Sequence, residues 1–150
     1  MTVSVEVLGE VTDEVVEAFG VLLPQLSSSA RAADREVLER VVGSAATTLL
    51  IARSDGKIAG TLSLVMFPIP TGLRAWIEDV IVDEAARGQG IGQILTVEAL
   101  RIAEEAGART VDLTSRPSRE AAGRLYERVG FESRSTRFYR YAFADHQPVS

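Results

Sequence analysis

Hydrophobic and polar positions alternate at the start of the chain and then change to a helical spacing. The alternation over residues 3–7 predicts a half-buried strand, because successive side chains of a strand point to opposite faces. Thr12 suits the start of a helix, and the apolar spacing of residues 15–23 predicts a helix that Pro24 and the serine run 27–29 end. A second, short helix is expected over residues 33–42.

The middle of the chain is rich in β-branched and aliphatic residues, interrupted by turn signals. Residues 47–53 and 58–67 predict two strands, and the Asp-Gly pair at 55–56 between them is a strong hairpin signal. A loop at 68–72 precedes a third hydrophobic strand at 74–82. We expect these three strands to form the centre of a sheet.

A long amphipathic helix follows a glycine-rich turn. Ile91, Leu95 and Ala99 recur at helical spacing and share one face, and Gly107 suits the position just after the helix end. The elements expected beyond it are a short strand at 110–114, a helix that Ser118 caps and that runs to Val129, Gly130 as its end, and one or two final strands in 131–142.

The order of these elements predicts the fold class. The order β-α-α-β-β-β-α-β-α-β-β is expected to give an α/β (α+β) fold, a mixed central sheet of about seven strands with helices on both faces. The strand, helix and strand from 74 to 114 require one parallel pair. Residues 1–150 are expected to form one domain, with 143–150 as a flexible tail.

Composition narrows the chemistry. Apolar runs of at most about eight residues are too short to cross a bilayer, and no leader-like segment opens the chain. We therefore expect a soluble, cytoplasmic protein without a membrane partner. The chain has no cysteine, and its one histidine, His146, lies in a polar tail, so no metal site is expected. The net charge of −5 argues against nucleic-acid binding.

The chemistry is expected in the turn that opens the long helix, which reads Arg87, Gly88, Gln89, Gly90, Ile91, Gly92. A helix amino terminus presents unpaired N–H groups with a partial positive charge, and glycines let an anion approach the main chain closely. Arg87 adds a cation on an otherwise acidic protein. The turn is a candidate cradle for a diphosphate, and the same glycines also suit a tight strand-to-helix turn without a ligand.

Two common phosphate-binding loops do not fit this spacing. The nucleoside triphosphate loop needs Gly-Lys followed by Ser or Thr, whereas Gly92 is followed by Gln93. The dinucleotide fingerprint G-x-G-x-x-G fails from either start, because Leu95 or Gln93 stands where its last glycine should be.

The turn resembles the acetyl-CoA loop of the GNAT superfamily of N-acetyltransferases, whose pattern is Gln or Arg, two residues, Gly, one residue, and Gly or Ala. Arg87, Gly90 and Gly92 fit this pattern. Residues 119–131 are similar to the family's A-x-x-x-Y-x-x-x-G-F helix and strand. The two motifs stand in the family's order, so the resemblance is strong from about residue 76 to residue 131 and topological before that.

The resemblance implies that acetyl-CoA binds as co-substrate and that no metal is needed. In the family the strand at 74–82 splays from the strand near Val111, the pantetheine arm pairs with the exposed backbone, and the diphosphate rests on the turn. The coenzyme-binding residues that this implies are Val80, Ile81, Val82, Arg87, Gly88, Gln89, Gly90, Ile91, Gly92, Arg119, Ala122 and Tyr126. An amine then attacks the thioester directly.

Two residues are expected to be catalytic. Tyr126 matches the family tyrosine that protonates the leaving thiolate, and its helical spacing also suits core packing. Glu78 is the candidate base, directly or through a water, because regular alternation would put it on the strand face of Val80 and Val82, with Asp79 opposite. A salt bridge or a strand-end cap is an equally open role for Glu78.

The residues around the acceptor are less well defined. Arg119 stands where the family often has asparagine, so it either reaches a coenzyme phosphate or is a solvated surface residue. The resemblance implies an acceptor pocket built from 24–34, 68–72 and the aromatic residues Phe138, Tyr139 and Tyr141. The same aromatic residues also suit core packing or a homodimer surface. We expect a small-molecule amine as acceptor rather than a peptide amine.

Two other functions fit parts of the pattern. A non-catalytic acyl-CoA-binding regulatory or interaction module would share the fold. A receiver-like nucleotide-binding domain would use acidic residues at strand ends, here Asp79, Asp83 and Asp112, to hold magnesium. The two ordered motifs favour the acetyltransferase.

Overall fold

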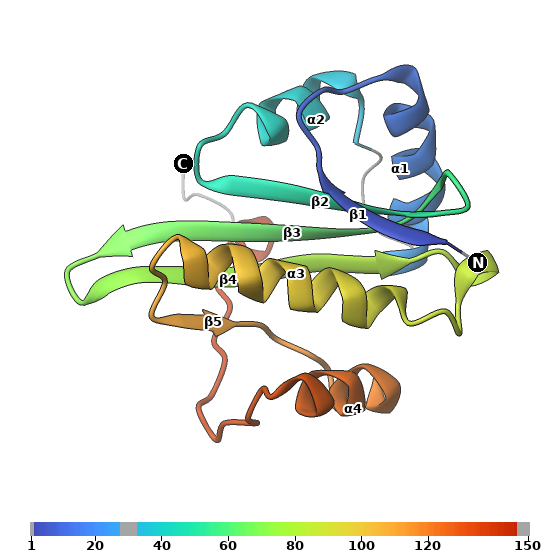
Figure 1. Ribbon diagram of the computed structural model, residues 1–150. Helices are drawn as coiled ribbons and strands as arrows, with labels where there is room; N and C mark the ends of the chain where they lie inside the picture. The colour runs from blue at the N-terminus through green and yellow to red at the C-terminus, as the bar shows by residue number, and fades with distance from the viewer. Residues whose placement is uncertain (1, 28–32, 147–150) are drawn as a thin grey trace.

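The computed structural model describes residues 2–27 and 33–146. A central sheet has helices on both faces (Figure 1). In chain order the elements are β1 (Val3–Val7), α1 (Asp13–Leu26), α2 (Arg35–Val42), β2 (Thr47–Ser54), β3 (Lys57–Ile69), β4 (Gly72–Val82), the 3₁₀ turn η1 (Glu84–Ala86), α3 (Ile91–Glu105), β5 (Thr110–Asp112), α4 (Glu120–Val129) and the 3₁₀ turn η2 (Phe143–Asp145).

The described sheet has five strands in the order β1-β2-β3-β4-β5. The first four pair antiparallel, and β4 pairs with β5 in parallel, with α3 as the crossover between them. This mixed sheet with helices on both faces confirms the predicted fold class. The hairpin predicted from the Asp-Gly pair is present, with Asp55 and Gly56 both at positive φ between β2 and β3.

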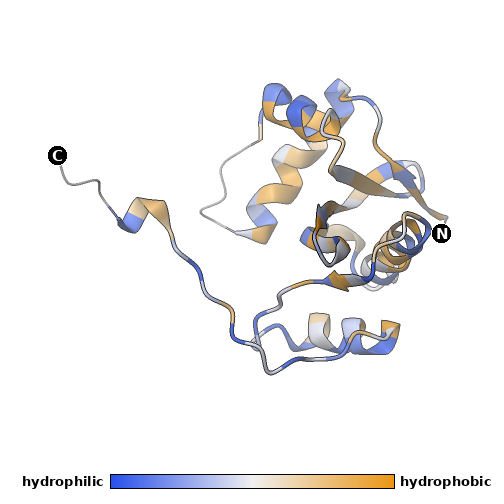
Figure 2. Cartoon of the chain, turned by 90° about the vertical axis from the view of Figure 1, so that its left-hand side faces the viewer, coloured by the Kyte–Doolittle hydropathy of each residue, from blue (hydrophilic) through white to orange (hydrophobic). Residues whose placement is uncertain are grey.

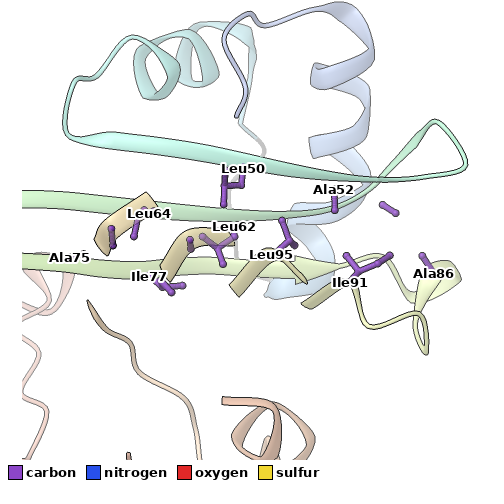
Figure 3. Close-up of a cluster of buried hydrophobic side chains, with 12 residues drawn as sticks. Leu50, Ala52, Leu62, Leu64, Ala75, Ile77, Ala86, Ile91 and Leu95 are labelled. Carbon is purple, nitrogen blue, oxygen red and sulfur yellow. The ribbon is translucent and has the colours of Figure 1, made fainter. Parts of the chain in front are cut away.

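One core layer lies between the sheet and α3. Leu50, Leu62, Leu64 and Ile77 from the strands meet Leu95 from the helix, and all five are at most 3% exposed (Figure 3). Close approach of α3 requires glycine at 60, because a Cβ there would lie 3.0 Å from the Ile81 carbonyl oxygen and 3.0 Å from Ile91 Cγ2. The helix that carries the glycine-rich turn is therefore fixed firmly on the sheet.

A second core layer lies on the opposite face, beneath α1 and α2. Its fully buried members include Leu22 from α1 and Ile51 from β2, and Leu38 from α2 joins them. Helix α1 continues through Pro24 to Leu26 with Ser27 as its C-cap, so the helix ends at the predicted serine run and not at the proline, while Ser28 and Ser29 lie outside the described residues. Proline removes the hydrogen bond back to the residue 20 carbonyl and crowds that carbonyl, and the helix ends within one turn of it.

Some element boundaries differ from the predicted ones. The β3–β4 ladder runs out to the pair Ile69 and Gly72, so most of the predicted loop at 68–72 belongs to the hairpin. Helix α4 begins at Glu120 rather than after Ser118, because Arg119 N–H donates to Arg116 O (2.9 Å) in a turn that delays the helix. Gly107 and Gly130 follow α3 and α4 at positive φ, which confirms both predicted helix ends.

The final strands predicted in 131–142 are not formed, so the expected number of about seven is wrong for the described residues. Residues 132–141 are exposed, and Figure 2 shows this segment running away from the sheet. The segment carries four arginines or glutamates among its first nine residues and packs on no core cluster, which removes the burial that would stabilise a strand.

The C-terminal segment ends in η2, so part of the predicted tail at 143–150 has local structure, while 147–150 lie outside the described residues. Phe138, Tyr139, Tyr141 and Phe143 are between 58% and 85% exposed, so core packing is wrong for them. A homodimer surface there stays a prediction. Among the described helices, none is both long and apolar enough to span a membrane.

Candidate functional site

The sheet opens between β4 and β5. These strands pair only from Arg74 to Trp76, opposite residues 110–112, although β4 continues to Val82. On its other edge, β4 stays paired with β3 up to Val82. Residues 77–82 therefore present one unpaired backbone edge of a strand that is otherwise held in place, which is the splay that the sequence motifs imply.

The glycine-rich turn follows this open edge directly. Gly88 and Gly90 have φ of +87° and +74°, the left-handed region that disfavours side chains, and a Cβ at either would meet open space. Gly90 is the N-cap of α3 and supplies no side-chain hydrogen bond. The first N–H groups of this 15-residue helix thus lack intrahelical acceptors, and the helix follows the open edge of β4 after one short turn.

Gly92 and Ile91 have a different function from the two left-handed glycines. A Cβ at Gly92 would lie 3.2 Å from Leu125 Cδ1, so glycine here lets α3 and α4 come together. The Ile91 side chain is buried in the core, which leaves only its backbone for a ligand. Packing against α4 brings the Tyr126 helix beside the turn.

Two polar side chains of the turn have contrasting contacts. Arg87 is exposed, and its guanidinium lies 4.0 Å from the Glu84 carboxylate, a distance too long to hold it in one place. Gln89 is held, because Ser54 Oγ donates to Gln89 Oε1 (2.7 Å). Arg87 is therefore free to reach an anion, whereas the Gln89 side chain fixes the turn to the end of β2.

An irregularity in β4 overturns the predicted faces of its side chains. Asp79 has φ +51°, and the β3–β4 register shifts at this point. Glu78 pairs with Ser63 on the α1 side, whereas Val80 and Val82 pack on the α3 core, so the prediction that Glu78 shares their face is wrong. A bulge inserts one residue, and the alternation changes sides beyond it.

The carboxylates at the bulge lie in distinct environments. Trp76 Nε1 donates a hydrogen bond to Glu78 Oε1 (2.7 Å), which orients that carboxylate on the α1 side of the sheet. Burial raises the pKa of Asp79, and the negative charge of Glu78 raises that pKa further. The sequence pattern predicted Asp79 on the strand face opposite Glu78. The structure shows the irregular backbone at Asp79 and the effect of the Glu78 charge on the pKa of Asp79.

Tyr126 lies on α4 in a half-buried position. Its ring meets Phe131 edge to face, with 5.8 Å between the ring centroids. Burial raises the pKa of the Tyr126 phenol, and the positive charge of Arg119 offsets part of that rise. The phenol is therefore held protonated at neutral pH and keeps a proton to donate. Ala122 lies one turn earlier on α4 and is also half-buried.

Arg119 is hydrogen-bonded to the end of α1. It is the N-cap of α4, and its guanidinium donates to the Leu26 carbonyl oxygen (3.3 Å) at the end of α1. Ile81 is likewise turned away from the α3 core, because its side chain is buried beneath α1. Of the twelve predicted coenzyme residues, these two contribute contacts to α1 rather than a side chain to the turn.

A separate hollow of about 490 Å³ lies between β1, β2 and α1. Its lining includes Glu6, Glu14 and Arg53, and no residue of β4, the turn or α4. The Arg53 guanidinium already donates to both glutamates at 2.7 and 3.0 Å, so its charge is neutralised. Within residues 2–27 and 33–146, no three acidic or histidine side chains gather as a metal site would require.

Comparison with known proteins agrees with this geometry. The sequence model of the acetyltransferase (GNAT) family matches residues 11–131, which include strands β2 to β5, the turn and Tyr126. The solved structure of a transcriptional regulator from Bacillus halodurans is 26% identical, with a TM-score of 0.80, and the similarity covers 95% of this chain and all of that one.

Two curated relatives share part of their length with this chain. N-alpha-acetyltransferase 30 of Schizosaccharomyces pombe is 39% identical over 71 residues, 47% of this chain and 47% of the relative. Glucosamine 6-phosphate N-acetyltransferase of Trypanosoma brucei is 36% identical over 90 residues, 58% of this chain and 59% of the relative. The chain thus matches about half the length of each relative, and the two names give different acceptors.

Proposed function

This chain belongs to the acetyltransferase (GNAT) family, and we propose that it transfers the acetyl group of acetyl-CoA directly to a primary amine of a small molecule. The observation that carries the proposal is the unpaired edge of β4 leading into a left-handed glycine turn at the start of α3. The family in general uses acetyl-CoA and an amine, and the residues present suit both.

The main chain supplies most of the coenzyme site in this proposal. Free N–H groups from Gly88 to Gly92 receive the diphosphate, and Arg87 adds a mobile positive charge. The unpaired backbone edge of residues 77–82 pairs with the amide groups of the pantetheine arm, much as an added strand would. An acidic protein can hold this polyanion because the donors are concentrated at one turn.

The side chains at the splay suit direct transfer. Glu78, directly or through a water, removes a proton from the attacking amine, whose nitrogen forms a bond to the acetyl carbon as the carbon–sulfur bond breaks. Tyr126 donates its phenol proton to the departing thiolate. A free N–H of the β4 edge stabilises the oxyanion that forms between these steps. Glu78 faces α1, so the acceptor approaches from that side of the sheet.

A small-molecule acceptor is favoured over a peptide. The adjacent carboxylates of Glu78 and Asp79 support this proposal, because together they suit a single ammonium group. The relative from T. brucei is named for a small amino sugar and that from S. pombe for protein amino termini. A panel of both amine classes, followed by release of free thiol, distinguishes them.

Binding of acetyl-CoA should raise thermal stability, whereas ATP and NAD should not. At about one hundred times its dissociation constant a ligand adds roughly 2.7 kcal/mol. Gly90→Ala should reduce this shift, because a side chain at φ +74° costs about 1 to 2 kcal/mol and disfavours the binding turn. The measurement is a thermal-shift titration of the variant beside wild type.

Gly20→Ala is the matched control for that titration. Gly20 lies inside α1, has no positive φ, and a Cβ there would meet nothing within 4 Å. Its alanine should keep the full acetyl-CoA shift and add about 0.5 to 1 kcal/mol of stability. An equal shift by ATP or NAD would remove the proposal. Acetyl-CoA binding without thiol release for any amine would favour a non-catalytic acyl-CoA-binding module instead.

Glu78→Gln should lower kcat about 10-fold and also change the titration of Asp79. Removing the Glu78 charge lowers the pKa of Asp79 toward its ordinary value, because one of the two causes of its rise is gone. A raised carboxyl pKa makes the folded state lose stability as pH rises from the ordinary aspartate range to the raised value. That loss should shrink in Glu78→Gln, as measured by Tm between pH 4 and 7.

Glu104→Gln on the exposed side of α3 is the charge-matched control and should leave both quantities unchanged. A Glu78→Gln variant with the kcat and the pH–rate profile of wild type would exclude Glu78 as the base. An unchanged dependence of Tm on pH would show that the charge of Glu78 does not affect the pKa of Asp79.

A further inference from the structure

The last turn of α1 is hydrogen-bonded, through the side chain of Gln25, to the segment between β4 and the glycine-rich turn. Gln25 Oε1 accepts from the Glu84 N–H (2.9 Å), and its Nε2 donates to Asp83 Oδ1 (3.3 Å) and to the Val21 carbonyl oxygen of its own helix (3.2 Å). In Figure 1, α1 passes behind the sheet and ends beside the end of β4. These contacts join segments 58 and 59 residues apart.

The two ends of the Gln25 amide have non-interchangeable partners. A backbone N–H can only donate, so it needs the oxygen end, and a carboxylate can only accept, so it needs the nitrogen end. Gln25 is half-buried, and its third bond, to Val21, ties the same nitrogen to α1. Three hydrogen bonds, to Val21, Asp83 and Glu84, thus hold the Gln25 amide in one orientation.

Asp83, which Gln25 contacts, is hydrogen-bonded both to the end of the β3–β4 ladder and to the start of η1. Its N–H donates to the Ala59 carbonyl oxygen (2.8 Å), which ends the β4 ladder, and its Oδ1 accepts from the Ala85 N–H (3.1 Å), which starts η1. Gln25 binds the same Asp83 Oδ1 and also the N–H of the next residue, Glu84. At the far end of the turn Ser54 holds Gln89. The segment from 83 to 90 is therefore fixed at both ends by residues outside the motif.

We infer that Gln25 is a positioning residue for the glycine-rich turn. It fixes Asp83 and Glu84, which lead into the turn, and so sets the affinity for acetyl-CoA without touching the coenzyme. The inference rests on the proposed function, because it takes the turn as the diphosphate site. A preorganised turn does not have to lose conformational freedom when the ligand binds, and loosening it reduces affinity.

Gln25→Ala should raise the Kd for acetyl-CoA about 5- to 10-fold, the range expected for losing hydrogen bonds to a charged group and a backbone amide. The Tm of the free protein should change little, because Leu22 and the other buried residues of α1 are untouched. The Glu84 amide should exchange with solvent faster. Calorimetric titration and amide hydrogen exchange give these two readouts.

Reversing the polarity of the contact gives a sharper test. Gln25→Glu still accepts from the Glu84 N–H but faces the Asp83 carboxylate with a like charge, so Kd should rise more than 10-fold. Adding Asp83→Asn removes the facing negative charge and keeps an amide oxygen for the Ala85 N–H. The double variant should recover toward the Kd of Gln25→Ala, because the like-charge repulsion is gone while the Nε2 bonds to Asp83 and Val21 stay lost.

Two single variants serve as controls. Asp83→Asn alone should bind nearly as wild type, since its amide oxygen can replace the carboxylate oxygen. Glu17→Gln on the exposed side of α1 should change Kd less than twofold. Failure of wild type to bind acetyl-CoA would overturn the proposed function together with this inference. Wild-type binding with an unchanged Kd in Gln25→Ala, or no rescue by Asp83→Asn, would overturn the inference alone.

Discussion

Replacing Tyr126 with phenylalanine should lower kcat about 100-fold while leaving the Kd for acetyl-CoA within about threefold of wild type. A positioned general acid contributes roughly 10²- to 10⁴-fold, and here the substitution removes only the hydroxyl. The ring keeps its edge-to-face contact with Phe131, so the packing of α4 is preserved. Steady-state kinetics with a saturating amine give kcat, and calorimetric titration gives Kd.

The pH dependence gives Tyr126→Phe a second, independent readout. Burial raises the pKa of the phenol, so wild type should keep its rate well into the alkaline range and lose it only as the phenol ionises. The variant has no such group and should lack this alkaline decline. Glu104→Gln on the exposed side of α3 is the control and should keep both the kcat and the alkaline decline of wild type. A Tyr126→Phe kcat within threefold of wild type would exclude the acid role.

Leu95→Ala should lower the free energy of unfolding by about 2 to 5 kcal/mol, the range for truncating a fully buried leucine. Leu95 is 0% exposed and lies at the contact of α3 with the sheet (Figure 3). Helix and sheet are in close contact here, since a Cβ added at Gly60 would lie 3.3 Å from Leu95 Cδ1. Urea unfolding measures the loss as a lower midpoint at an unchanged m-value.

Ile94→Ala is the matched control on the same helix. Ile94 is 39% exposed, so its truncation removes less buried surface and should cost under about 1 kcal/mol. Equal losses for Leu95→Ala and Ile94→Ala would mean that α3 presents a different face to the sheet. The position of the coenzyme turn would then also be wrong, since α3 carries it.

The sequence predicts those parts of the fold that depend on local signals. The Asp-Gly turn at 55–56 and the glycines that end α3 and α4 each require a positive φ, and that requirement is visible in the residue itself. The strands expected in 131–142 show where this reasoning fails. Strand formation depends on a partner edge and on burial, and a segment's own residues record neither.

The same distinction applies to the candidate site. The two motifs give Gly90, Gly92 and Tyr126 as candidates directly, because the family pattern specifies the residue type at each of these positions. The bulge at Asp79 could not be predicted, since period-two alternation assumes a regular ladder and one inserted residue reverses every face beyond it. The contacts of Gln25 and Arg119 join distant segments and become visible only in the folded chain.

The most direct test of the central claim is a crystal structure of the chain with coenzyme A bound. The account predicts the diphosphate within hydrogen-bond distance of the N–H groups between Gly88 and Gly92, and the pantetheine arm along the unpaired edge of β4. The sulfur should lie next to the Tyr126 hydroxyl. A coenzyme bound elsewhere, with those N–H groups hydrated and the β4 edge uncovered, would contradict it.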